Sequence, residues 1–420
     1  MMHNSGGSGR SHGFVAPSMT NCRPISVITA TPPGFNPGML ASQVAARWFL
    51  DRHGLGSNAT FFRLVPLTDR LAGMDAAARS ACLRRCEDGI DYRLLEHADQ
   101  LHGTTPLYWG DLLHMRQYLD SIRGLQRAAR CTPEELLLLR GAPEDLIRRA
   151  VSFGTTFLYH DATDLTADEY GPSFRHFLVN ARLVMPRDIV SLAQLATVVP
   201  GAPLLPGLDA TQLFCGMADW RGAFPEGTDT ACADANGLLC HFARGRHDIA
   251  DLKHAVAEFS QGFSLPVRWL PWGDSLSFPY LRHYEGQLGL EDATGGREPS
   301  LSAILETVAA AKCLLTDTYH VAVIAWSLGT PALLIRGNYW PNDFNAVVDK
   351  RYVFYVQHGL QELFLATARE HDELAVFIRR AVKVVSEGRV LEWYRSSVVL
   401  RAEACERRLA AALSEESNGG

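Results

Sequence analysis

Short apolar runs alternate with amphipathic segments along nearly the whole of this 420-residue sequence. Apolar residues that recur every three or four positions are typical of helices, and short apolar runs rich in β-branched and aromatic residues are typical of buried strands. A regular strand–helix–strand order favours parallel sheets, because each parallel strand needs a crossover connection to the next. The sequence therefore predicts an α/β protein with parallel sheets.

A polar segment rich in small residues, 224–237, divides this alternation into two stretches. Strands are expected before it at 25–30, 61–67, 106–109, 155–160 and 182–185, and after it at 238–243, 267–272, 313–316, 332–335 and 353–356. We therefore expect two Rossmann-like domains, 24–223 and 238–369, with 224–237 as their linker. Their sheets would face a cleft, since ligands bind beyond the carboxyl ends of parallel strands.

The two ends of the chain differ in character. Residues 1–23 are rich in Gly, Ser, His and Asn and lack the apolar core of a signal peptide or an anchor, so we expect a disordered arm. Helices are expected at 370–413, where they could cross back over the first domain, and a disordered tail at 414–420. The longest apolar stretch, 321–335, contains Gly329 and Pro331 and is too short to span a membrane.

Charge and cysteine usage narrow the class of protein. Acidic residues outnumber basic ones by 46 to 40, whereas proteins that neutralise nucleic-acid phosphates are normally basic, so no nucleic-acid partner is expected. The nine cysteines include no Cys-x-x-Cys pair, and Cys82 and Cys86 have no second pair to complete a zinc set. We expect reduced thiols, a cytoplasmic location and no metal site. Peripheral contact with the inner face of a membrane and assembly into a homo-oligomer both stay open.

The segment 300–340 carries the most information about a site. A buried strand at 313–316 is followed by the polar run 317–320 and then at once by a helix. That helix should end at Gly329, because glycine accepts the left-handed conformation and Pro331 prevents continuation. His320 is therefore expected at the carboxyl end of a strand, next to helix N–H groups that attract anions. The alternative is a polar residue that merely starts the helix.

The same segment resembles the motif of the polysaccharide pyruvyl transferase superfamily, Thr-Asp-Arg-Leu/Tyr-His followed by Ala and Gly-x-Pro. The matching residues are Thr316, Asp317, Tyr319, His320, Ala325, Gly329 and Pro331. Further similar segments are 36–38, 153–156, 186–191 and 206–209. Thr318 stands where the family has arginine, and 108–111 departs from the family's glycine-rich turn.

This resemblance covers about residues 25–360 and implies a GT-B-like fold, with the acceptor on the first domain and the donor on the second. It implies a transferase of exopolysaccharide biosynthesis that moves pyruvate from phosphoenolpyruvate (PEP) to a saccharide or lipid-linked sugar as a ketal. PEP would be a co-substrate, and no cofactor is expected. Two alternatives stay open: a GT-B glycosyltransferase that uses a nucleotide sugar, and a non-catalytic protein that binds a glycan or a nucleotide.

Pyruvyl transfer needs an acid for the methylene carbon of PEP and cations for its charges. His320 is the candidate acid, since imidazole titrates near neutral pH. The candidate donor site consists of Arg244, Arg246, Thr318, Tyr319 and Arg336, and the candidate acceptor site consists of Asn36, Gly38, Arg187 and Asp317. The alternatives are solvated or ion-paired arginines, and a tight turn in which Asn36 caps a helix.

Overall fold

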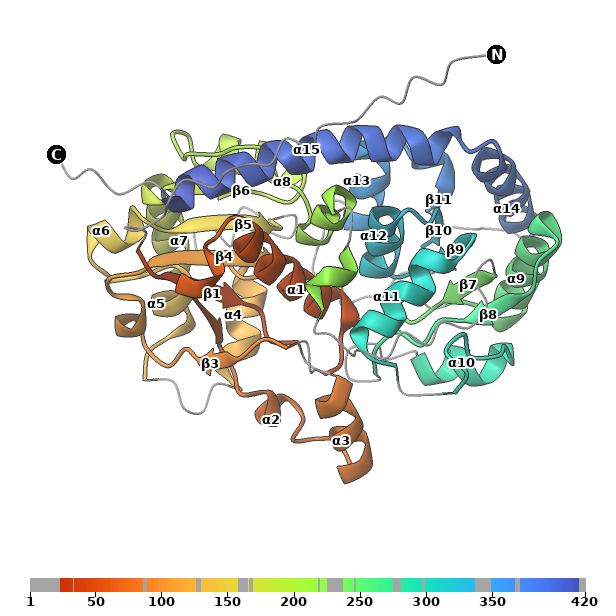
Figure 1. The fold of residues 1–420 in the computed structure, drawn as a ribbon, viewed down its shortest axis with the longest axis horizontal. Helices are drawn as coiled ribbons and strands as arrows, with labels where there is room; N and C mark the ends of the chain where they lie inside the picture. The colour runs from red at the N-terminus through yellow and green to blue at the C-terminus, as the bar shows by residue number, and fades with distance from the viewer. Residues whose placement is uncertain are drawn as a thin grey trace, which may run out of the picture.

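The computed structural model describes residues 23–32, 34–85, 89–125, 130–157, 165, 169–217, 220–224, 237–244, 247–274, 281–296, 299–336, 349–366 and 371–414. Two α/β domains lie side by side, and a long C-terminal helix runs over both of them (Figure 1). Almost all of the expected N-terminal arm, linker and C-terminal tail falls outside the described residues.

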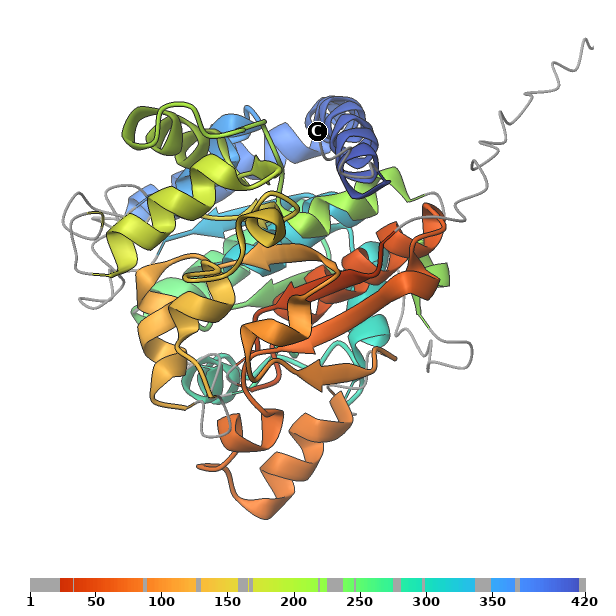
Figure 2. The same cartoon turned by 90° about the vertical axis from the view of Figure 1, so that its left-hand side faces the viewer.

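The first domain is built on a six-stranded sheet with the order β3-β2-β1-β4-β5-β6, in which all neighbours are parallel. The strands are β1 (Ile25–Thr29), β2 (Ala59–Arg63), β3 (Tyr92–Leu94), β4 (Thr105–Asp111), β5 (Val151–Thr155) and β6 (Leu183–Met185). Side chains alternate between two cores, so that Val27 packs on the side of α1 (Pro37–Arg52) and Ile28 on the side of α4 (Arg116–Arg123). Figure 2 shows these helices on opposite faces of the sheet.

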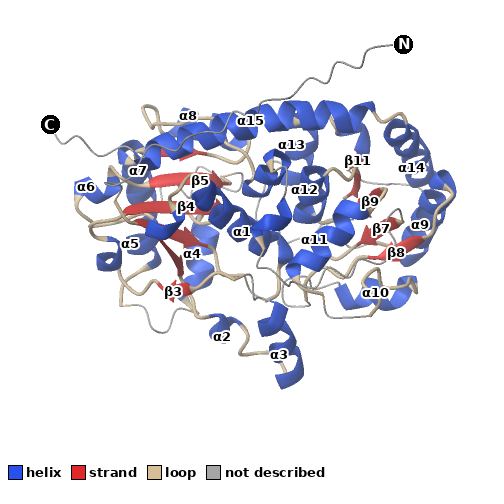
Figure 3. Ribbon diagram, viewed as in Figure 1, coloured by secondary structure: helices blue, strands red, loops and turns tan. Residues whose placement is uncertain are grey.

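The second domain has a five-stranded parallel sheet with the order β11-β10-β9-β7-β8. Its strands are β7 (Leu238–His241), β8 (Val267–Trp269), β9 (Cys313–Thr316), β10 (Ala332–Ile335) and β11 (Phe364–Leu365). Its helices are α9 (Ile249–Phe263), α10 (Leu281–Leu288), α11 (Leu301–Ala310), α12 (Tyr319–Leu328) and α13 (Lys350–Gln357). Figure 3 shows the two sheets as separate groups of strands with helices around each. Two wound parallel sheets confirm the expected fold class.

Apart from the C-terminal pair, the remaining helices complete the first domain or join it to the second, except η6 (Gln361–Leu363), which packs on β10 and α13 of the second domain. They are η1 (Gly56–Asn58), α2 (Leu67–Arg70), α3 (Ala76–Arg85), η2 (Ala98–Leu101), α5 (Pro133–Leu137), α6 (Glu144–Ile147), α7 (Tyr170–Asn180), α8 (Ile189–Val198), η4 (Ala210–Gly216), η5 (Trp220–Ala223) and η6. Among these, η4 packs against α1 on one side and α12 on the other, so it contacts both domains.

Of the C-terminal helices, α14 (His371–Ser386) packs on the second domain and α15 (Arg389–Ser414) packs on both domains. Helix α14 lies against α9, and α15 then crosses to the first domain (Figure 1). At its far end the carbonyl of Ala412 accepts a hydrogen bond of 2.8 Å from Arg182, and Glu406 lies 3.6 Å from both Arg52 and His53. None of the helices in the described ranges combines the length and apolar character needed to cross a membrane.

Several expected strands are wrong in detail, including the one expected at 61–67, which lies at 59–63, and the one expected at 267–272, which ends at 269. Residues 353–356 lie inside α13, because Asp349 caps that helix and Tyr355 packs inward to donate a 2.8 Å hydrogen bond to the carbonyl of Ala332. The strand expected at 155–160 lies at 151–155 instead. Gly154, which the sequence places in a turn, has a φ of +70° yet sits within that strand.

Candidate functional site

His320 lies where the two domains meet. It is the second residue of α12, directly after the carboxyl end of β9. Gly38 is the second residue of α1, a few residues beyond the carboxyl end of β1. A β-carbon added to Gly38 would stand 2.6 Å from Cγ and 2.7 Å from Nδ1 of His320. The imidazole of the second domain therefore rests directly on the first turn of α1.

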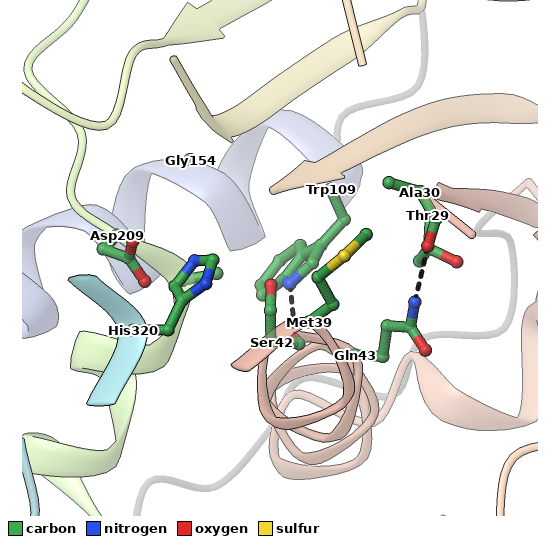
Figure 4. Close-up of a pocket in the computed structure, with 10 residues that line it drawn as sticks. Thr29, Ala30, Met39, Ser42, Gln43, Trp109, Gly154, Asp209 and His320 are labelled. Atoms are coloured by element: carbon green, nitrogen blue, oxygen red, sulfur yellow. Dashed lines mark hydrogen bonds between the residues drawn. The ribbon is translucent and has the colours of Figure 1, made fainter. Parts of the chain in front are cut away.

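A small hollow opens beside this imidazole (Figure 4). It is lined by Thr29, Ala30, Met39, Ser42, Gln43, Trp109, Gly154, Asp209, Ala210 and His320. It has about 10 Å³ of space for the centre of a water-sized molecule, which is about what one water needs. Its wall comes from the carboxyl ends of β1, β4 and β5, from α1 and from the start of η4, and His320 closes it from the second domain. Ligands of wound parallel sheets bind at this edge.

Asp209 is the carboxylate beside His320 (Figure 4). Its Oδ1 caps η4 by accepting hydrogen bonds from the amide of Thr211 at 3.0 Å and from its hydroxyl at 2.7 Å. Burial opposes ionisation, but the charges of His320 and Arg187 outweigh it, so the pKa of Asp209 lies below its ordinary value. Asp209 is thus ionised at neutral pH and can stabilise a protonated imidazole.

Arg187 and Tyr319 hold Asp209 from two further elements. Arg187 is only 2% exposed, and its Nη1 lies 3.6 Å from Oδ2 of Asp209. The hydroxyl of Tyr319 donates to the same oxygen at 3.2 Å, and the guanidinium carbon of Arg187 lies 4.8 Å from the centre of the tyrosine ring. Burial raises the pKa of Tyr319 well above its ordinary value, so this hydroxyl remains a donor.

Asp317 fixes the loop after β7. Its carboxylate is fully buried and accepts hydrogen bonds of 2.9 Å from the amides of Ala243 and Arg244. It also lies 3.1 Å from Nε2 of His247 and accepts the hydroxyl of Thr318 at 2.9 Å. Because the Thr318 hydroxyl is engaged there, this N-cap residue makes no side-chain cap to α12. Uncapped helix amides attract anions.

Cationic side chains surround the start of α12. Nζ of Lys350 lies 5.0 Å from the centre of the Tyr319 ring, and Nη1 of Arg351 donates at 3.0 Å to the carbonyl of Asp317. Arg336 lies farther along, where its Nε is 3.0 Å from Oδ2 of Asp349. The sequence pointed to Arg336 but not to Lys350 or Arg351.

The residues expected at the site gather in two places. Gly38, Arg187, Tyr319 and His320 meet around the hollow, whereas Arg244, Asp317, Thr318 and Arg336 lie at the carboxyl edge of the second sheet. Asn36 is buried and accepts the amide of Met39 at 3.4 Å, the capping role given as its alternative. Arg246 lies outside the described residues.

Sequence reasoning missed Asp209 as a site residue. The pattern Asp209-x-x-Gln212 is typical of a capping box, and both of its hydrogen bonds form in the structure. The pattern predicts a helix start and gives no sign that His320 lies beside the carboxylate. The wall residue Gln43 was also missed, because its role comes from a 2.8 Å hydrogen bond between α1 and the carbonyl of Ala30, just after β1. In the described ranges, no three His, Cys, Asp or Glu residues cluster as metal ligands would.

Comparison with solved structures finds chains of similar fold. UDP-GlcNAc 2-epimerase from Neisseria meningitidis, bound to UDP-GlcNAc, is 12% identical with a TM-score of 0.53 over 93% of this chain and 99% of its own. S. aureus MnaA, in a co-structure with UDP, is 10% identical with a TM-score of 0.50 over 95% and 99%. A UDP-glucosyltransferase from Polygonum tinctorium is 13% identical with a TM-score of 0.49 over 94% and 100%.

No family model matches the sequence, and no curated protein matches it either. The likeness is therefore one of fold, and it confirms the expected GT-B-like arrangement of two Rossmann-like domains.

Proposed function

We propose that this protein is a GT-B transferase that uses a nucleotide sugar as donor and His320 as its proton-transferring group. The observation that carries the proposal is the placement of His320 against Gly38 with the ionised Asp209 beside it. The imidazole of His320 lines the hollow, while the backbone of the same residue belongs to the first turn of α12. It is therefore placed to exchange a proton with a hydroxyl bound in the hollow. Two chains of similar fold bind UDP-GlcNAc and UDP, which makes a uridine nucleotide the first donor to test.

The donor diphosphate would bind at the start of α12. The N-cap residue Thr318 makes no side-chain cap there, and the helix dipole adds positive potential. Lys350 stands beside this turn, and its charge suits a phosphate better than an uncharged ligand. Arg351 also lies there but is ion-paired with Asp349, and the backbone amide of Arg244 is tied to the turn through Asp317.

The reaction assigns separate roles to the residues around the hollow. His320 takes the proton of an acceptor hydroxyl as that oxygen bonds to the anomeric carbon of the donor. The bond from the anomeric carbon to the phosphate oxygen breaks, and the nucleoside diphosphate leaves with the electron pair. Asp209 stabilises the imidazolium that forms, while Arg187 and Tyr319 hold Asp209 in place.

Pyruvyl transfer from PEP, which the sequence resemblance implied, is the second candidate. His320 could serve pyruvyl transfer as the acid, since it lines the hollow and belongs to the first turn of α12. The arginine of the family motif is replaced by Thr318, whose hydroxyl is engaged with Asp317. A nucleotide sugar is therefore the stronger candidate donor, and a non-catalytic binding protein is the third case to separate.

Ligand-dependent thermal stability separates these functions. We expect UDP or another nucleoside diphosphate to raise the melting temperature, since a ligand at 100 times its Kd adds about 2.7 kcal/mol, and PEP to leave it unchanged. Lys350→Gln should weaken nucleotide binding about tenfold, whereas Lys253→Gln, an exposed lysine on α9 of the same domain, should not. Stabilisation by PEP alone would contradict the proposal and favour pyruvyl transfer.

A further inference from the structure

Two arginines stand at the carboxyl edge of the first sheet, next to the hollow. Arg63 is the last residue of β2 and lies in register beside Thr29 of β1, a wall residue of the hollow. Arg70 is the last residue of α2 and lies near Tyr118. The Tyr118 hydroxyl accepts the amide of Thr31 at 3.1 Å, just beyond β1. Arg63 thus lies at the strand ends beside the hollow, and Arg70 lies on the helix that follows β2.

Neither guanidinium is neutralised by the protein. Nε and Nη2 of Arg63 and of Arg70 are shielded from solvent, and in the described part of the chain no oxygen accepts a hydrogen bond from them and no carboxylate pairs with them. Buried donors are almost always bonded, so four such nitrogens at one edge need an explanation. Burial also lowers the pKa of Arg70, although guanidinium remains charged in proteins.

Two other arginines of this fold, Arg149 and Arg351, receive acceptors from the chain itself. Arg149 donates at 3.0 Å to the carbonyl of Thr104 and at 2.5 Å to Asp145. Arg351 donates through Nε and Nη2 to the two oxygens of Asp349. Nε and Nη2 of Arg63 and of Arg70 receive no such acceptor from the described residues.

A chain of hydrogen bonds ties Arg63 to the wall of the hollow. The guanidinium carbon of Arg63 lies 3.6 Å from the centre of the Tyr92 ring. The Tyr92 hydroxyl donates at 2.7 Å to Gln43, whose amide nitrogen donates at 2.8 Å to the carbonyl of Ala30. Gln43 and Ala30 both line the hollow (Figure 4). The cation therefore has a fixed place relative to the position where an acceptor hydroxyl would react.

We infer that the acceptor carries an oxyanion, a phosphate or a carboxylate, which binds Arg63 and Arg70 while its reacting hydroxyl lies at His320. This inference rests on the proposed transferase function. A planar guanidinium binds the two oxygens of such a group in a bidentate manner, and Arg63 and Arg70 are each half-buried with two guanidinium nitrogens shielded from water. The protein keeps two uncompensated charges because the substrate supplies the counter-charge.

Binding measured by calorimetry in the presence of saturating UDP tests this inference. The probes are inorganic phosphate, glucose 6-phosphate, glucuronate and glucose, so that phosphate and carboxylate are tested in separate arms. We expect at least one anionic probe to bind at least tenfold more tightly than glucose. Arg63→Gln and Arg70→Gln should each reduce that affinity about tenfold. Arg93→Gln, which removes an exposed arginine from the neighbouring strand β3, should change it less than twofold.

Three results would overturn the inference: no anionic probe binds, glucose binds equally well, or both variants keep the affinity of wild type. A second readout is the melting temperature without ligand, which should be unchanged or higher in Arg63→Gln and Arg70→Gln, because an uncompensated charge is removed. A clearly lower melting temperature in both would assign the arginines a structural role. UDP affinity should be equal in all variants. If UDP fails to bind while the anions do, the proposed donor is wrong and the anion site stands.

Discussion

At position 38 the absence of a side chain lets the imidazole of His320 lie against the first turn of α1. A β-carbon there would overlap the imidazole, with Cγ only 2.6 Å away. We predict that Gly38→Ala lowers kcat by about tenfold to a hundredfold, because small misplacements of a reacting group are costly. Steady-state kinetics with the donor identified by thermal shift would measure the loss.

Gly286 offers a matched control for this substitution. It is also a helical glycine, in α10, and a β-carbon added to it meets no atom within 4 Å. Gly286→Ala should leave kcat unchanged and raise stability by up to about 1 kcal/mol, since alanine is the better helix former. Equal kcat in Gly38→Ala and wild type would show that the contact with His320 does not matter for turnover.

The carboxylate of Asp209 compensates the buried charge of Arg187. The loss of stability caused by replacing Asp209 should therefore depend on pH. The folded-state pKa of Asp209 is lowered, so its contribution to stability is present above the unfolded pKa of about 3.9 and is lost as the pH falls through the folded value. Asp209→Asn should therefore cost about 3 kcal/mol at neutral pH, and the deficit should shrink below about pH 4. Urea denaturation of both proteins at the two pH values measures it, and a deficit that stays constant would contradict this role.

At the scale of elements, Asp317 joins the loop after β7 to the start of α12. In Asp317→Asn one acceptor oxygen becomes an NH₂ group facing donors, which leaves buried donors unbonded at a cost of about 3 kcal/mol. Asp248→Asn is the control, because Asp248 caps α9 and asparagine caps a helix equally well. Chemical denaturation should separate the two variants. A stable Asp317→Asn protein that has lost only acceptor affinity would instead support the role in acceptor binding that we expected from the sequence.

The elements around His320 were the most predictable part of the chain. The expected strands at 313–316 and 332–335 match β9 and β10 residue for residue, and α12 ends at Gly329 with a φ of +93°. Their signals are local: continuous apolar runs, a glycine in the left-handed conformation and a following proline. Where local signals compete, the prediction fails, as at 353–356. Valine and aromatic residues there favour a strand, but the cap at Asp349 and the packing of Tyr355 produce a helix.

The composition of the candidate site was less predictable for a physical reason. Asp209, Gln43 and His320 are brought together only when η4 packs between α1 and α12. No periodicity or short motif records a contact between two domains, so the sequence identified His320 and Gly38 separately without their contact. Lys350 was likewise hidden, because the segment that contains it was read as lying before a strand.

At the scale of the whole molecule, α15 ties the two domains together. Tyr394 is fully buried, and its hydroxyl accepts a hydrogen bond of 3.1 Å from Gln212, whose side-chain oxygen accepts the amide of Asp209. The same amide nitrogen of Gln212 lies 3.0 Å from Nε2 of His358. Burial lowers the pKa of His358 to about 3, so this imidazole is neutral and its Nε2 can accept. The helix that covers both domains thus also supports the site carboxylate.

We predict that Tyr394→Phe lowers the unfolding free energy by about 1 kcal/mol, the usual contribution of one buried hydrogen bond. Because α15 packs on both domains, the transition should shift as a whole and remain single. Differential scanning calorimetry would show this, with the exposed Tyr352 replaced by Phe as the control. Two separate transitions in the variant, with only one of them shifted, would contradict a structural link between the domains.

The most direct test of the account is the turnover of His320→Gln with a nucleotide sugar that stabilises the wild type. Release of the nucleoside diphosphate is measured for both proteins, and nucleotide affinity is measured beside it. The account predicts turnover at least about a hundredfold slower in the variant. Nucleotide affinity should stay within about twofold of wild type, because the donor phosphates bind backbone amides of the first turn of α12 and not the imidazole. Equal turnover in the two proteins would contradict the account.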